Sequence, residues 1–157
     1  MVRAAVVLAL VCGAAAAQEA DPVHDGKKAS EWVNELRNDA SARKRAQAAA
    51  ALGPLWVKHQ YKAASADLPR SMRLDSSPAV RAACVRAFGA LPVVFANDLA
   101  KEVADAFAGE KEAAVRKEFA IAVARFPEVA KKAVEPLSAV LKDPDPAARI
   151  AAAEALA

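Results

Sequence analysis

The sequence has few of the residues on which β-rich or disulfide-bonded domains depend. Among 157 residues there are two cysteines, five glycines, two tryptophans, one tyrosine and five phenylalanines. A β-sandwich relies on aromatic and β-branched side chains, so this composition argues against one. The apolar fraction is 55% and is dominated by alanine, the strongest helix former. We therefore predict an all-α chain of about one domain.

The chain also lacks a strong excess of charge of one sign. Its 22 lysines and arginines are nearly balanced by 19 acidic residues, and the formal net charge is +3. Proteins that bind nucleic acid or an anionic membrane usually concentrate basic residues on one face. Here both signs are interspersed, so we expect neither as a partner.

The first 17 residues have the layout of a cleavable signal peptide. Met1-Val2-Arg3 gives a cationic start, residues 4–17 are apolar or small, and Ala15-Ala16-Ala17 forms an A-x-A cleavage site. The apolar run is shorter than the roughly 20 residues that span a bilayer as a helix. We predict cleavage after Ala17, with Ala20 as the alternative, and export to the periplasm or the medium without stable membrane insertion. Residues 18–28 are polar and are expected to form a flexible lead-in.

Residue clusters typical of catalysis or cofactor binding are missing. After cleavage the histidines and the cysteine are His24, His59 and Cys84, which lie far apart and lack the spacing of metal ligands. Cys84 cannot form an internal disulfide and is expected to be a buried core thiol. There is no glycine-rich nucleotide-binding loop and no nucleophile motif. The acids Asp143 and Asp145 suit a turn and a helix cap. We predict no enzymatic activity, no metal and no cofactor.

One pattern recurs four times along the chain. In each instance an arginine follows an acid by six positions and precedes an apolar residue by seven, and successive arginines are 33 to 36 positions apart. Such a recurrence is typical of stacked structural repeats, here over residues 29–56, 60–92, 97–127 and 129–157. The arginines are Arg45, Arg81, Arg116 and Arg149, the acids are Asp39, Asp75, Glu110 and Asp143, and the apolar residues are Leu52, Phe88, Val123 and Leu156.

Each repeat is predicted to be a pair of helices, with the arginine one turn into the second. N-cap positions fall four residues before each arginine, at Ser41, Ser77, Glu112 and Asp145. The acid then lies in the turn between the paired helices. Opposite charge and short reach predict a tie between arginine and acid, within a repeat or across to its neighbour. We interpret these residues as a structural ladder, because a ligand would meet each repeat differently.

Glycine and proline positions predict where helices end. Gly53 with Pro54 indicates the end of the first repeat's second helix, and Gly89 the end of the second repeat's. Residues 56–67 would then form the longest linker, followed by a short helix over residues 68–74. Pro136 lies inside a helical pattern, where proline is expected to cause a kink.

The fourth repeat resembles a HEAT repeat. Three segments carry the resemblance: Ala133–Leu137 with its proline, the aspartate-rich turn and arginine of Leu141–Arg149, and Ala151–Leu156. Ser77–Gly89 matches similarly. The period is shorter than the roughly 40–47 of HEAT units and close to the roughly 34 of tetratricopeptide repeats, whose W-x₂-L-G-x₂-Y series is absent. The resemblance is nearest to compact HEAT-like repeats of bacterial proteins and phycobilisome lyases. It implies an α-solenoid of about four helix pairs that serves as a scaffold or binding surface.

The expected function is therefore an exported scaffold for protein–protein interaction. Its alternatives are an accessory segment of a larger exported enzyme and a bilin-handling protein like the phycobilisome lyases. Mixed charge on the second helices favours a protein or peptide partner. Trp56 has two interpretations, an exposed anchor for a partner or a closure of the core beneath the linker. The candidate partner-binding residues are Trp56, His59 and Tyr61 in the linker and Gln47, Arg86 and Lys117 on the second helices.

Overall fold

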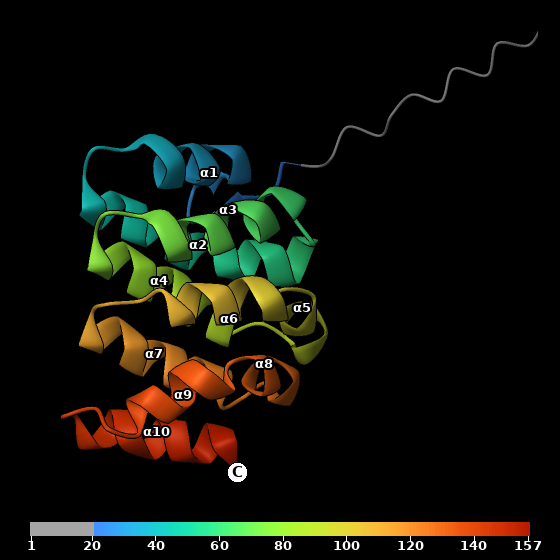
Figure 1. The fold of residues 1–157 in the computed structure, drawn as a ribbon. Coiled ribbons are helices and arrows are strands. Elements are labelled where there is room, and N and C mark those ends of the chain that lie inside the picture. The colour runs from blue at the N-terminus through green and yellow to red at the C-terminus, as the bar shows by residue number, and fades with distance from the viewer. Residues whose placement is uncertain (1–20) are drawn as a thin grey trace, which may run out of the picture.

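The computed structural model describes residues 21–157, apart from the side chains of residues 62 and 63. The predicted signal peptide, residues 1–17, lies outside the described residues. In the described part the prediction of a helical chain is confirmed (Figure 1). The elements are β1 (Val23–His24), β2 (Lys27–Lys28), α1 (Ala29–Asn38), α2 (Ala42–His59), α3 (Lys62–Leu74), α4 (Pro78–Gly89), α5 (Val93–Asp98), α6 (Ala100–Ala108), α7 (Ala113–Val123), α8 (Pro127–Lys132), α9 (Val134–Val140) and α10 (Pro146–Leu156).

The helices form two layers that are stacked in sequence order. In one layer α2 contacts α4, α4 contacts α7, and α7 contacts α10. In the other, α1 contacts α3, α3 contacts α6, and α6 contacts α8 and α9. Figure 1 shows the stack running from α1 to α10, so the two ends of the described chain lie far apart. The core fills the space between the layers, with Phe88, Phe107 and Phe119 fully buried.

The second helix of each pair begins where the sequence predicts. α2, α4, α7 and α10 start directly after the expected N-cap positions. Only Asp145 caps with its own side chain, accepting the backbone N–H of Ala147 at 2.8 Å. At the other three starts no N-cap side chain makes this bond. The position of the ladder arginine is therefore a better guide to the helix start than the chemistry of the cap.

The predicted linker over residues 56–67 is wrong. α2 continues through Gly53 and Pro54 to His59, and α3 begins at Lys62, so the connection is only two residues long. Proline displaces the carbonyl four residues earlier, which belongs to Ala50. Both Pro54 and Ala50 are exposed, and a carbonyl on the solvent side of a helix can tilt outward to water. Proline is tolerated in the helix for this reason.

Close contact between the second helices explains the two glycines that were expected to be caps. A Cβ atom added at Gly53 would lie 3.3 Å from the Cβ of Ala87, and one added at Gly89 would lie 3.1 Å from the Cβ of Ala122. Both separations are tighter than ordinary contacts. Gly53 lies within α2 and does not end it, whereas α4 does end at Gly89, as the sequence predicts. Both glycines also let the following second helix approach closely.

Two of the first helices are divided in two. α5 and α6 meet at Leu99, and α8 and α9 meet at Ala133. Pro136 was expected to kink the fourth of these helices. The division falls just before it, because the proline ring collides with the carbonyl of Lys132, the last residue of α8.

Residues 21–28 form an ordered hairpin in place of the expected flexible lead-in. β1 and β2 pair antiparallel, with Val23 opposite Lys28. Asp25 and Gly26 join them with positive φ values of 49° and 79°, as a tight hairpin turn requires. The hairpin is held on α1 because the indole N–H of Trp32 donates to the His24 carbonyl at 2.9 Å.

Candidate functional site

The ladder arginines reach forward to the acid of the next repeat. Arg45 binds Asp75 through Nε–Oδ2 and Nη2–Oδ1, both 2.8 Å. Arg81 binds Glu110 in the same paired manner, at 2.7 and 2.9 Å. Arg116 reaches Asp143 by one contact of 3.3 Å between Nη2 and Oδ2. The paired geometry matches the planar guanidinium to the carboxylate and is the strong form of this interaction.

Each ladder arginine also binds the turn of its own repeat. Nη1 of Arg45 donates to the backbone carbonyl of Asp39 at 2.9 Å, and Nη1 of Arg81 donates to that of Asp75 at 2.9 Å. Nη1 of Arg149 makes the same bond to Asp143 at 2.8 Å. One guanidinium therefore connects two successive turns.

The ladder acids organise the start of the second helix as well. Asp75 accepts the backbone N–H of Ser77 at 2.8 Å, Glu110 that of Glu112 at 2.8 Å, and Asp143 that of Asp145 at 3.0 Å. In each case the acid accepts the N–H of the residue two positions later, which is the N-cap residue of the helix. The arrangement resembles the turns that aspartate forms with its own backbone. The acid thus satisfies the backbone N–H of the N-cap residue, which is a different donor from the first-turn N–H groups that an N-cap side chain accepts.

Burial and pairing act in opposite directions on two ladder acids. The side chains of Asp75 and Glu110 are 8% and 3% exposed. Burial alone raises the pKa of each carboxyl, but hydrogen bonds from Arg45 and Arg81 and from backbone N–H groups outweigh it and lower the pKa. These carboxylates are charged at neutral pH and already paired. The two rungs formed by Arg45 with Asp75 and by Arg81 with Glu110 therefore offer no free charge to a ligand.

A further pair of the same kind joins the first helices. Arg37 on α1 binds Asp67 on α3 through Nε–Oδ1 at 2.7 Å and Nη2–Oδ2 at 2.8 Å, and the Asp67 side chain is 3% exposed. Sequence reasoning missed it because residue 67 was assigned to a linker. The separation of 30 residues, shared with Arg45 and Asp75, is the signal that could have revealed it.

The structure separates the predicted binding residues of the linker. Trp56 is 6% exposed, and its ring centroid lies 6.2 Å from that of Phe95. Tyr61 is half-buried at the start of α3, whereas His59 is exposed at the end of α2. Trp56 therefore closes the core, as the second interpretation proposed, and the three residues form no exposed cluster.

Two of the three predicted residues on the second helices are paired with an acid of the next repeat or its second helix. Arg86 on α4 contacts Glu118 on α7 at 3.0 Å, and Lys117 on α7 contacts Asp145 at the start of α10 at 2.8 Å. Both pairs are substantially exposed. Gln47 on α2 is exposed too. Exposed pairs of this kind add little to stability and leave their side chains able to exchange partners.

Two cavities lie in succession over the C-terminal ends of the second helices. The larger, of about 460 Å³, is lined by β1, by the end of α2 and by Ala90. The smaller, of about 170 Å³, lies between α4 and α7 and is also lined by Ala90. We call this surface the second-helix groove and define it by Val23, His24, Pro54, Val57, Lys58, His59, Arg86, Ala90, Glu118, Ile121 and Arg125.

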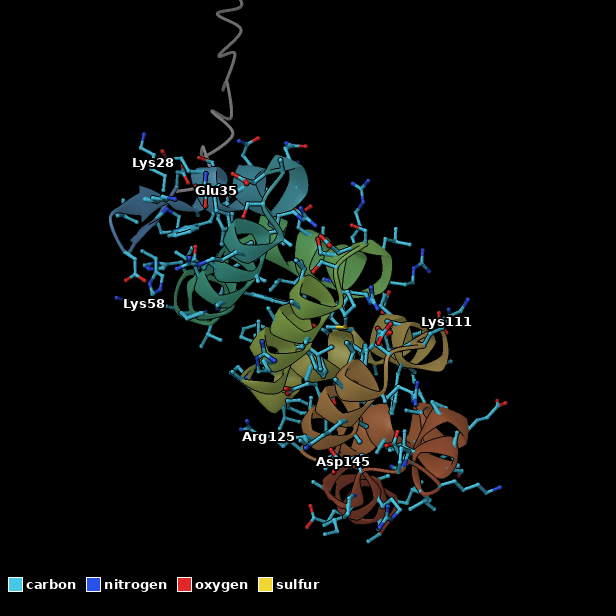
Figure 2. All side chains as sticks on the ribbon, turned by 90° about the vertical axis from the view of Figure 1, so that its left-hand side faces the viewer. Lys28, Glu35, Lys58, Lys111, Arg125 and Asp145 are labelled. Atoms are coloured by element: carbon cyan, nitrogen blue, oxygen red, sulfur yellow. The ribbon has the colours of Figure 1, made fainter. Side chains whose placement is uncertain are left out.

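The second-helix groove combines exposed apolar side chains with positive charge. Val23, Val57 and Ile121 are 61%, 39% and 45% exposed. The positive charge comes from Lys58, Arg86 and Arg125. Among the described residues that line either of the two cavities, Glu118 is the one acid, and it is paired with Arg86. Figure 2 shows Lys58 and Arg125 on the same side of the molecule, opposite Lys111.

No group of three or more metal-ligating side chains gathers within residues 21–157. Cys84 is fully buried, and burial raises the pKa of its thiol to about 12, so it is not a nucleophile in the folded protein. In the same range of residues, no helix is both long and apolar enough to cross a membrane. The second-helix groove offers apolar contacts and a positive rim.

Comparison with models of known protein families, with curated proteins and with solved structures finds no match to this chain.

Proposed function

We propose that this protein is an exported α-solenoid scaffold of four HEAT-like helix pairs that binds another protein and performs no catalysis. Stacked helix pairs and a ladder that repeats in phase with them support the architecture. The signal-peptide layout of residues 1–17 supports export. Solenoids characteristically bind partners along an extended face of one helix layer, and the second-helix groove is such a face.

The proposal rests mainly on one observation, namely that an apolar hollow in the second-helix groove continues into a surface with a basic rim. The larger cavity accepts apolar side chains against Val57 and Pro54, and the surface continues past Ala90 toward Arg125. Apolar burial supplies affinity, while the rim charges select the partner and speed its approach. The best-fitting partner is an extended or helical protein segment with apolar anchors flanked by acidic residues.

The proposal is tested by capturing partners with matched charge-reversal variants. The mature chain is used as bait in a native envelope extract, beside Val57→Glu/Lys58→Glu, which alters the groove. The control is Leu74→Glu/Lys111→Glu, which makes the same change of charge at two exposed residues away from it.

We expect a stoichiometric partner with the native chain and with the control but not with the groove variant, and we expect its crosslinked segment to be acidic. Circular dichroism verifies that all three baits are folded. Equal loss in both variants, or no partner with the native bait, would contradict the proposal.

A further inference from the structure

The last second helix exposes a position that is buried in the other three. The fourth residue after the ladder arginine is Ala49, Val85, Ala120 or Ala153, in repeat order. The first three are 0% exposed, each on a helix that packs against the next second helix. Ala153 is exposed, and its neighbour Ile150 is 59% exposed. α10 therefore carries a small apolar surface at a register that elsewhere receives a helix.

The arginine ladder is incomplete at the same place. Nη1 of Arg149 donates to the backbone carbonyls of Asp143 and Pro144 at 2.8 and 3.0 Å. Nε and Nη2, the edge with which Arg45 and Arg81 hold the next carboxylate, have no acceptor among residues 21–157. The backbone bond fixes the guanidinium at the position from which the other arginines reach forward.

We propose that the face of α10 formed by Arg149, Ile150 and Ala153 is a docking site for a further helix pair of the same build. The turn of that pair supplies an aspartate or glutamate to Nε and Nη2 of Arg149. Its second helix lays a small residue over Ala153, as Ala87 lies against Gly53. The unpaired edge of Arg149 requires a carboxylate, and the exposed register at Ala153 requires a packed helix. A helix pair with an acid in its turn supplies both.

A second copy of this chain does not fit the site. Lys44 and Gln47 on α2 are exposed, whereas the matching residues on the later helices include the buried pairs Val80 with Ala83 and Ala148 with Ala151. Stacking one copy on another would bury a charge and an amide on α2. That end of the stack is already polar, and the β1–β2 hairpin packs on α1 beside it. The site lies at the other end and is separate from the second-helix groove, so this inference stands apart from the proposed function.

The experiment extends the full chain by one repeat. A copy of residues 125–157 is added after Ala157, which places the copied Asp143 27 positions after Arg149, the separation of Arg116 from Asp143. Hydrogen exchange of the α10 amides and the thermal midpoint are measured with and without the extension. We expect exchange in α10 to slow by about tenfold or more and the midpoint to rise.

Two substitutions make the outcome specific. Ala153→Lys is expected to leave the unextended chain unchanged, since the side chain is exposed there, and to remove most of the gain in the extended chain, where that register would be buried. Asn in place of the copied Asp143 is expected to remove part of it. Unchanged exchange in α10, or an Ala153→Lys substitution that is equally harmless in both chains, would overturn the proposal. So would a dimer of the unextended chain that Ala153→Lys dissociates, because a second copy would then cover the face.

Discussion

Arg81 holds Glu110 by two parallel hydrogen bonds, and the carboxylate that it neutralises is almost completely buried. Arg81→Ala leaves that charge unpaired inside the protein, which we expect to lower the free energy of unfolding by about 3 kcal/mol or more. Affinity for a partner, per folded molecule, should not change.

The matched control for Arg81→Ala is Arg86→Ala on the same helix. It breaks an exposed cross-repeat pair, Arg86 with Glu118, and should cost only about 0–1 kcal/mol. Urea unfolding followed by circular dichroism measures both. Similar losses in the two variants would show that the paired, buried ladder contact contributes no more to the free energy of unfolding than an exposed ion pair does.

The lowered pKa values of Asp75 and Glu110 predict a loss of stability in acid. A carboxyl whose pKa is lower in the folded than in the unfolded protein stabilises the fold at pH values above its unfolded pKa. Protonation of the folded form removes that contribution. The unfolding midpoint should therefore fall as the pH drops below the ordinary values of 4.5 for Glu110 and 3.8 for Asp75.

The variant that isolates one rung in acid is Glu110→Gln. It should be less stable than the native chain at pH 7 and should lose less further stability between pH 5 and pH 2. Parallel curves for the two proteins would assign the acid sensitivity to other groups.

Because α4 and α7 are in close contact at Gly89 and Ala122, substitutions at these two positions should have non-additive effects on stability. Gly89→Ala places a Cβ 3.1 Å from that of Ala122 and should destabilise the protein by about 1 kcal/mol or more through overpacking, despite the better helix propensity of alanine. Ala122→Gly in the same chain should relieve this crowding. Thermal unfolding of the single and double variants gives the coupling, and strict additivity would contradict it.

The thiol of Cys84 should report global opening of the core. Because the side chain is fully buried and its pKa is raised to about 12, a thiol reagent at pH 8 should not modify the folded chain that begins at residue 18. The rate of modification should increase with urea in parallel with unfolding. Rapid modification in the absence of urea would show that α4 opens locally.

Features tied to the repeat register were predictable from sequence, and those that depend on local exposure were not. Arg81 locates the start of α4 because its spacing reflects repeat geometry. Pro54 indicates a helix end by its residue type, yet α2 continues through it. The exposure of the Ala50 carbonyl that it displaces cannot be read from the sequence. Gly53 has a close-packing role that depends on Ala87, 34 residues later. The β1–β2 hairpin could not be predicted, because strands of two residues are too short to show an alternating hydrophobic pattern.

The candidate site was predicted less well than the fold. His59 and Arg86 do line the second-helix groove, but Val23 and Ile121 come from other elements and show no sequence signal. Trp56, at the start of the supposed linker, is buried against Phe95, which agrees with the second of its two interpretations. A surface that is assembled from the ends of several helices cannot be located without knowing how those helices pack.

The dual use of Asp75, Glu110 and Asp143 makes neighbouring repeats interdependent during folding. Asp75 shapes the turn that starts α4 and receives Arg45 from the preceding repeat, so the turn and the contact between repeats form together. A completed repeat presents an arginine to a segment that emerges later from the ribosome. Assembly can therefore proceed by accretion from the N-terminal end, and the molecule should melt cooperatively, with α10 the first helix to fray.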